Sequence, residues 1–158
     1  MKFKKWKPYI LWAILVEAIG FLAGILTREG MAIFQMYAEK PPLTPPGWVF
    51  PVVWGILYGL MGISAAIVWL KPDSDDRTKA MQAFWIQLAM NFLWTLIFFN
   101  AQAYSIAAFW ILALWAAVAY MIIRFLKVDR LAALLQIPYL IWLTLATYLS
   151  FGVWLLNS

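Results

Sequence analysis

The residues best able to do chemistry in this chain are a few polar side chains set inside long apolar segments. Gln87, Asn91 and Thr95 recur at intervals of four, so on a helix they would share one face. A polar side chain is costly in lipid and usually turns towards protein or a cavity. The spacing therefore predicts a hydrogen-bonding stripe that faces the inside of the molecule.

Two further apolar segments carry stripes of aromatic and small residues. The stripes are Tyr139, Trp142, Ala146 and Ser150 in one segment, and Trp54, Tyr58, Met61 and Ala65 in the other. Three such faces predict one internal cavity with aromatic walls and a few hydrogen-bonding points. The alternative is that they are helix-packing seams, where small and polar residues are also enriched.

The number of tryptophans bears on the kind of ligand that the cavity could hold. The chain has 11 tryptophans, more than an interfacial belt requires, and flat rings at depth suit a flat, apolar, conjugated ligand. They suit ordinary core packing equally well.

Glu17 is the only carboxylate inside an apolar segment. It could bind a cation or relay a proton, or it could bond to a neighbouring helix or lie near the membrane interface.

The residue types that are missing exclude several functions. Without Cys or His the chain cannot form a disulfide, a thiolate or imidazole metal site, or a Ser/His or Cys/His catalytic pair. No GxxxxGK[ST] motif for ATP is present. We therefore expect no metal site and no bound cofactor.

The elements that must position these residues follow from composition. Of 158 residues, 66% are hydrophobic and 12% are charged, which excludes a water-exposed globular surface. We predict an all-α membrane protein, a single bundle of five transmembrane helices that forms one domain over residues 1–158. The N-terminal lysines and apolar run could be a signal peptide, but the run continues to Leu26, so we interpret it as an uncleaved span. The predicted spans are 9–27, 50–70, 80–99, 106–126 and 131–156.

Proline and glycine predict local features. Pro41, Pro42, Pro45 and Pro46 predict a stiff, non-helical loop over residues 28–49, and Pro138 predicts a kink in the fifth span. Five glycines at spacings of three and four permit close approach of helices, within the bundle or between subunits. They are Gly20 and Gly24 in the first span, and Gly55, Gly59 and Gly62 in the second.

The basic residues predict the orientation. Ten of the 12 Lys and Arg residues fall on one side of the predicted spans, and only Arg28 and Lys40 fall on the other. The positive-inside rule then places the N-terminus in the cytoplasm, and the proline loop and C-terminus outside, in a multi-pass protein of the cell membrane. The expected partner of the positive charge is a bilayer surface rather than nucleic acid.

At this point the motifs show a resemblance. The segment KPPLTPPGWVF at 40–50, followed by WGILYGLMG at 54–62, resembles the signature of the TspO/MBR family. This family comprises the tryptophan-rich sensory proteins and translocator proteins, or peripheral-type benzodiazepine receptors. QLAMN at 87–91 with Trp94, and PYLIW at 138–142 with ATYL at 146–149, resemble its third and fifth spans.

The resemblance implies a homodimer of five-helix subunits with a pocket between helices, capped by the proline loop. It implies binding of porphyrins such as protoporphyrin IX, or another flat apolar molecule, and of benzodiazepine-site ligands. Trp54 and Trp142 match pocket tryptophans, the latter associated with light-dependent porphyrin degradation. The expected ligand-binding residues, from the stripes and the resemblance together, are Pro45, Pro46, Trp48, Trp54, Tyr58, Gln87, Asn91, Trp94, Tyr139, Trp142 and Ala146.

Three functions remain open. The chain could be a receptor or sensor, a facilitative transporter of tetrapyrroles or other apolar molecules, or an enzyme that degrades porphyrin photochemically through Trp54 and Trp142. The absence of conventional acid, base and metal-ligating residues restricts the enzyme to radical or photochemical steps. Porphyrin propionates are anionic, so Lys40 or Arg28 could pair with them at the pocket mouth.

Overall fold

The computed structural model describes residues 2–158, with side chains from residue 4 onwards, as a bundle of long α-helices. Within this part of the chain, five helical stretches are long and apolar enough to cross a membrane, which confirms the all-α membrane fold. The elements are α1 (Lys2–Leu26), α2 (Arg28–Tyr37), α3 (Val49–Trp69), α4 (Asp75–Thr95), the π-helical segment η1 (Leu96–Asn100), α5 (Tyr104–Leu126), α6 (Arg130–Leu134) and α7 (Ile137–Leu156).

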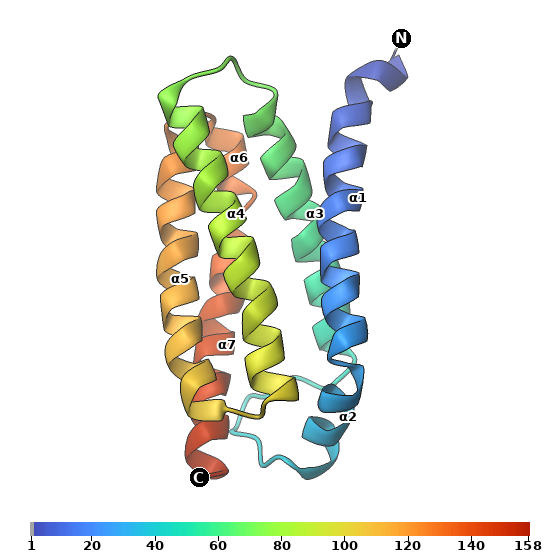
Figure 1. Cartoon of the computed structure of the whole chain (residues 1–158), viewed down its shortest axis with the longest axis vertical. Helices are drawn as coiled ribbons and strands as arrows, with labels where there is room; N and C mark the ends of the chain where they lie inside the picture. The colour runs from blue at the N-terminus through green and yellow to red at the C-terminus, as the bar shows by residue number, and fades with distance from the viewer. Residues whose placement is uncertain (1) are drawn as a thin grey trace.

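The two termini lie at opposite ends of the bundle, as an odd number of spans requires (Figure 1). The connections over residues 71–74 and 127–129 lie at the N-terminal end, whereas α2 and the proline-containing segment lie at the C-terminal end. The structure thus gathers the predicted basic side of the chain at one end of the molecule.

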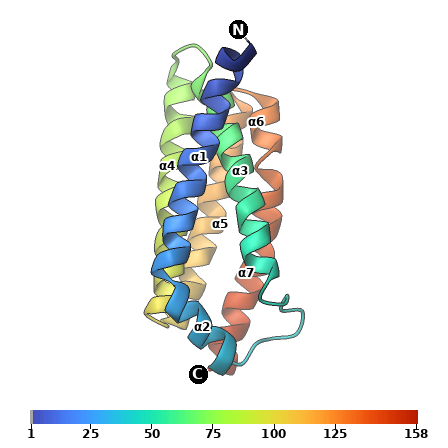
Figure 2. The same cartoon turned by 90° about the vertical axis from the view of Figure 1, so that its right-hand side faces the viewer.

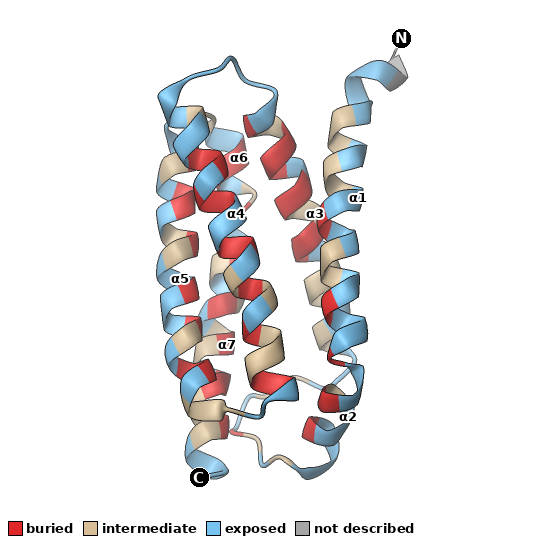
Figure 3. Ribbon diagram, in the orientation of Figure 1, coloured by how far each residue is buried: buried red, intermediate tan, exposed pale blue. Residues whose placement is uncertain are grey.

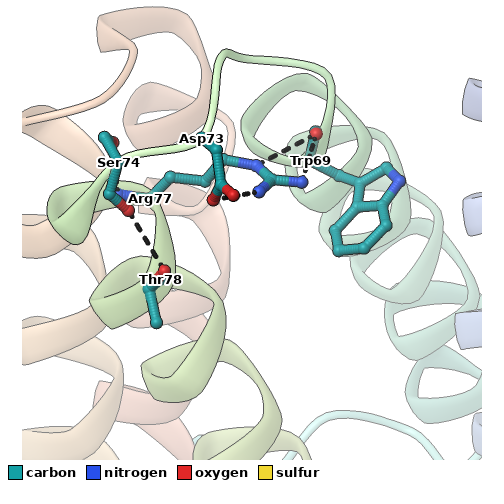
Figure 4. A network of polar contacts seen from close by, with 5 residues as sticks. All are labelled: Trp69, Asp73, Ser74, Arg77 and Thr78. Carbon is teal, nitrogen blue, oxygen red and sulfur yellow. Dashed lines mark hydrogen bonds and ion pairs between the residues drawn. The ribbon is translucent and has the colours of Figure 1, made fainter.

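Arg77 ties α3 to α4 at that basic end (Figure 4). Its Nε and Nη2 atoms donate to the carbonyl oxygen of Trp69 at 3.1 and 2.9 Å, and its guanidinium lies 4.6 Å from the Trp69 ring centroid. Its Nη1 atom lies 3.0 Å from Asp73 Oδ1. Ser74 caps α4, because its Oγ accepts a hydrogen bond from the Arg77 backbone amide. The last carbonyl of α3 and the Arg77 amide in the first turn of α4 are therefore both satisfied.

The prediction of a non-helical loop over residues 28–49 is wrong for its first half, which forms α2. The prolines begin at Pro41 and cannot restrain the ten residues of α2 that precede them. Phe34 anchors this helix, because its ring packs 5.2 and 5.6 Å from the rings of Phe98 and Phe99. A Cβ on Gly30 would lie only 2.4 Å from the Phe99 carbonyl oxygen, so glycine permits the close approach of α2 to η1.

The helix is interrupted just before Pro138, the position where the sequence predicts a kink. α6 ends at Leu134 and α7 begins at Ile137, which places Pro138 in the first turn of α7, where its missing amide costs no hydrogen bond. Asp129 caps α6 by accepting a hydrogen bond from the Ala132 amide at 3.0 Å. The fifth span therefore consists of two helices.

Glycine packs α1 against α3 over part of their length. A Cβ on Gly62 would lie 2.5 Å from Ala13 Cα, and one on Gly20 would lie 2.4 Å from the Tyr58 ring. The glycine pattern thus serves packing within the chain at these two positions. α1 is nevertheless the most exposed span (Figure 3). Only 11% of its membrane-spanning stretch is buried inside the structure, against 44% for α3.

Candidate ligand-binding site

A cavity of about 890 Å³ opens between α1, α2, α3, α7 and the end of α4 with η1. This volume lies in the range of small-molecule and cofactor sites. Its wall is almost entirely apolar, and the only charged residues among those that line it are Glu17 and Arg28. The aromatic residues of the wall are Phe21, Phe34, Phe50, Trp54, Tyr58, Trp94, Phe98, Phe99 and Trp142.

Trp54 stands at the centre of one aromatic wall. Its ring stacks on Tyr58 at 5.4 Å and 29°, and meets the edge of Trp142 at 6.4 Å and 88°. Phe50 packs edge-on against Trp142 at 5.7 Å. Rings from α3 and α7 are thus fixed at right angles to one another, an arrangement that can hold a flat ligand by stacking and by edge contacts.

A second aromatic wall comes from α4 and η1. Trp94 stacks on Phe98 at 5.0 Å and 28°, and Phe99 meets Phe98 edge-on at 4.8 Å. The π-helical segment accommodates one extra residue within the last turns of this span, and π-bulges of this kind are frequent at functional sites. Phe98 and Phe99 belong to this segment, and both are buried and line the cavity.

A fully buried hydrogen-bonded network supports the first wall from behind. The Tyr58 hydroxyl donates to Asn91 Oδ1 at 3.2 Å, and Asn91 Nδ2 donates to the Tyr139 hydroxyl at 2.7 Å. The Tyr139 hydroxyl donates to Gln87 Oε1 at 2.7 Å. Gln87, Asn91 and Tyr139 are at most 1% exposed. The network joins α3, α4 and α7, and holds the Tyr58 ring in the cavity wall.

The 11 residues expected to bind ligand therefore divide into three groups. Five line the cavity: Trp54, Tyr58, Trp94, Trp142 and Ala146. The other six are outside the lining: Gln87, Asn91 and Tyr139 lie in the buried network, and Pro45, Pro46 and Trp48 lie in the loop.

The loop nevertheless borders the cavity, through the neighbouring residues Thr44 and Gly47. Trp48 is 69% exposed. Sequence reasoning missed the contributions of α2 and of Phe98 and Phe99, which also line the cavity. Their signal was an aromatic pair one turn after Trp94.

Tyr148 of α7 and Asn157, the residue that follows α7, fasten the loop to the bundle. The Glu39 amide donates to Asn157 Oδ1 at 3.0 Å, and Asn157 Nδ2 donates to the Glu39 carbonyl at 2.8 Å. The Tyr148 hydroxyl donates to the Pro42 carbonyl at 2.8 Å. Residues 39–42 are therefore fixed to the C-terminal end of α7, and the segment that follows them reaches the cavity.

The two cations considered for the pocket mouth have different surroundings. Lys40 Nζ donates to the carbonyls of Gln35 and Ala38 at 3.2 and 3.0 Å, and lies 4.9 Å from the Phe34 ring centroid. It caps the end of α2 and is absent from the cavity lining. Arg28 does line the cavity, two residues beyond the end of the first span. An anionic group at the mouth would therefore meet Arg28.

These features define the class of protein: a multi-pass helical membrane protein with an aromatic, ligand-sized cavity inside its bundle. Comparison with known proteins gives the family. Residues 12–155 match the TspO/MBR family, and the chain belongs to that family.

Named relatives come from bacteria, archaea and animals. The chain is 42% identical to Protein CrtK of Rhodobacter capsulatus over 151 residues, which cover 92% of this chain and 94% of the relative. It is 38% identical to the Tryptophan-rich protein TspO of Archaeoglobus fulgidus, with the same coverage. It is 36% identical to the Translocator protein of Homo sapiens, over 89% of this chain and 85% of the relative.

Proposed function

We propose that this membrane protein is a receptor or sensor that binds porphyrins of the protoporphyrin IX type, and benzodiazepine-site ligands, in the cavity between its helices. The single observation that carries the proposal is the aromatic wall of Trp54, Tyr58 and Trp142 around about 890 Å³ of apolar space. Stacked and edge-on rings favour a flat conjugated ligand over a flexible chain. Family membership supports the same choice.

A titration of the purified protein in lipid nanodiscs with protoporphyrin IX tests the proposal through quenching of tryptophan fluorescence. We expect saturable quenching, with Trp142→Phe weakening the affinity. Trp115→Phe is the matched control, because Trp115 lies on α5, outside the cavity lining. Its Nε1 atom donates a hydrogen bond to Thr144 Oγ1. Equal affinity in the two variants and the wild type would contradict the proposal.

A second candidate is light-dependent degradation of the bound porphyrin. It is favoured by the position of the Trp54 and Trp142 rings, 6.4 Å apart and both in the cavity wall, where they would touch the ligand. Illumination of the complex should bleach the porphyrin spectrum in the wild type and not in Trp142→Phe. Equal bleaching in both proteins would leave binding as the function.

The proposal includes a location and an assembly. The basic end of the bundle would face the cytoplasm of the cell, so the cavity mouth at α2 and the loop would face outwards. The bilayer lipids would be constant partners, and the subunit would pair with a second copy as a homodimer.

A facilitative transporter of the same ligands differs from a receptor because it releases them on both sides of the membrane. Measuring the flux of protoporphyrin IX across the membrane of proteoliposomes distinguishes the two functions.

A further inference from the structure

The seam between α1 and α3 is closed around the middle of the two helices and opens towards α2. The two helices run antiparallel, and three positions on one face of α1 meet α3 in turn. A Cβ on Gly62 would lie 2.5 Å from Ala13 Cα, and one on Gly59 would lie 3.7 Å from Glu17 Oε2. One on Gly20 would lie 2.4 Å from the Tyr58 ring. Along α1 from residue 13 to residue 20, the residue of α3 in contact changes from 62 to 58, as the antiparallel direction requires.

Continuing this register by one turn brings Gly24 of α1 opposite Gly55 of α3. Here the contact is lost, because a Cβ on either glycine would meet no atom within 4 Å. Both glycines line the cavity. The helices therefore separate at this level, and no side chain from either glycine fills the space between them. In Figure 2, α1 and α3 cross in the upper half of the view and diverge towards α2.

The residues that flank this gap face outwards as well as inwards. Phe21 and Ile25 of α1 line the cavity, yet they are 72% and 55% exposed. Pro51 of α3 also lines the cavity and is exposed. All three lie within the stretches predicted to cross the membrane. Since the outer surface of these stretches meets hydrocarbon, the gap connects the cavity with the lipid rather than with water.

We propose that the seam at Gly24 and Gly55 is a lateral portal, through which an apolar ligand dissolved in the bilayer enters and leaves the cavity. This inference rests on the proposed function, because it concerns the route of the same ligand. The two glycines keep the portal open, since any larger side chain would project into it. The substrate class is accordingly a molecule that partitions into lipid before it binds. The seam stays closed where Ala13 meets Gly62 and where Gly20 meets Tyr58.

The test measures transfer of protoporphyrin IX from preloaded vesicles to the protein in proteoliposomes, by stopped-flow tryptophan quenching. We expect Gly24→Leu and Gly55→Leu each to lower the association and dissociation rate constants about tenfold, while the equilibrium affinity changes much less. Ala18→Leu is the matched control, because Ala18 is an exposed residue of α1 outside the cavity lining, and we expect wild-type rates from it.

Four outcomes would overturn the portal. Rates that stay unchanged in both glycine variants would do so, as would a weaker affinity with faster dissociation, which would mean that leucine merely fills the cavity. Slow transfer only in Gly47→Leu would assign entry to the aqueous mouth at the loop, which Gly47 borders. If the wild type shows no saturable binding, the proposed function itself fails, and the portal fails with it.

A pair of cysteines tests the portal without relying on a bulky side chain. The chain has no cysteine, so Gly24→Cys with Gly55→Cys allows a single reducible bis-thiosulfonate cross-link. We expect transfer to stop after cross-linking and to recover in the same sample after reduction. Transfer that continues across the cross-linked seam would refute the portal even if the leucine variants failed to fold.

Discussion

Asn91→Leu is the substitution that most sharply tests the buried network behind the cavity wall. Asn91 is 1% exposed, and leucine is close to it in shape, so the change removes hydrogen bonds with little change in volume. The Tyr58 hydroxyl loses its acceptor, whereas Tyr139 keeps Gln87 Oε1 as its acceptor. One buried donor is thus left unsatisfied, at a cost of about 1–3 kcal/mol.

The membrane lowers this figure, because a polar group in the unfolded state also finds partners within the bilayer. Interhelical hydrogen bonds measured by double-mutant cycles in a membrane protein average about 0.6 kcal/mol. We therefore expect Asn91→Leu to lower the free energy of unfolding by about 1–2 kcal/mol. The measurement is reversible unfolding in mixed micelles, followed by circular dichroism.

Thr147→Val is the matched control for Asn91→Leu, because Thr147 donates only to the Leu143 carbonyl of its own helix, at 2.7 Å. We expect this control to change the free energy of unfolding by less than about 0.5 kcal/mol. Tyr58→Phe combined with Asn91→Leu should cost less than the sum of the two single changes, because the partners are removed together. An Asn91→Leu protein as stable as the control would refute the network as a stabilising element.

Three further predictions concern packing, pH and the loop. Gly62→Ala should destabilise the protein in thermal unfolding by about 1–3 kcal/mol, because the new methyl group would meet the backbone of α1, whereas Gly59→Ala should be nearly neutral. Burial would raise the pKa of Asp129, but the hydrogen bond from Lys71 and the amides of α6 outweigh it and lower this pKa overall. The stability from Asp129 is therefore present above the ordinary Asp pKa of about 3.9 and lost below it, so Asp129→Asn should flatten the acid limb of a stability–pH curve. Asn157→Ala removes both hydrogen bonds to Glu39 and should speed limited proteolysis within residues 38–48.

Much of the fold could be predicted from the sequence, because membrane spans depend on local composition. Long uncharged apolar runs mark the spans, and the break before Pro138 follows from the geometry of proline. The loop predicted from the four prolines does not extend to α2, because proline restrains its own segment from Pro41 onwards and not the ten residues of the helix before it. The stability of α2 comes from the contact of Phe34 with Phe98 and Phe99, which are more than 60 residues away along the chain.

The candidate site was predictable in composition more than in arrangement. Helical spacing correctly predicted inward faces for Trp54, Trp142 and Asn91, and left the choice between cavity wall and packing seam open. The structure contains both, since Trp54 and Trp142 line the cavity while Asn91 bonds within the core. Periodicity defines the face of a helix but not the distance to the next helix. For the same reason, Gly20 and Gly24 look alike in the sequence, although only Gly20 is in close contact.

Filling the cavity and measuring the affinity for protoporphyrin IX tests most directly whether the ligand occupies this cavity. Ala146 lies in the cavity wall and is 8% exposed, whereas Ala113 is an exposed residue of α5 outside the lining. In nanodisc titrations, we predict that Ala146→Phe weakens binding at least about tenfold, the loss of roughly 1.4 kcal/mol, and that Ala113→Phe binds like the wild type. Wild-type affinity in a helical, monodisperse Ala146→Phe protein would contradict the central claim that the ligand occupies this cavity.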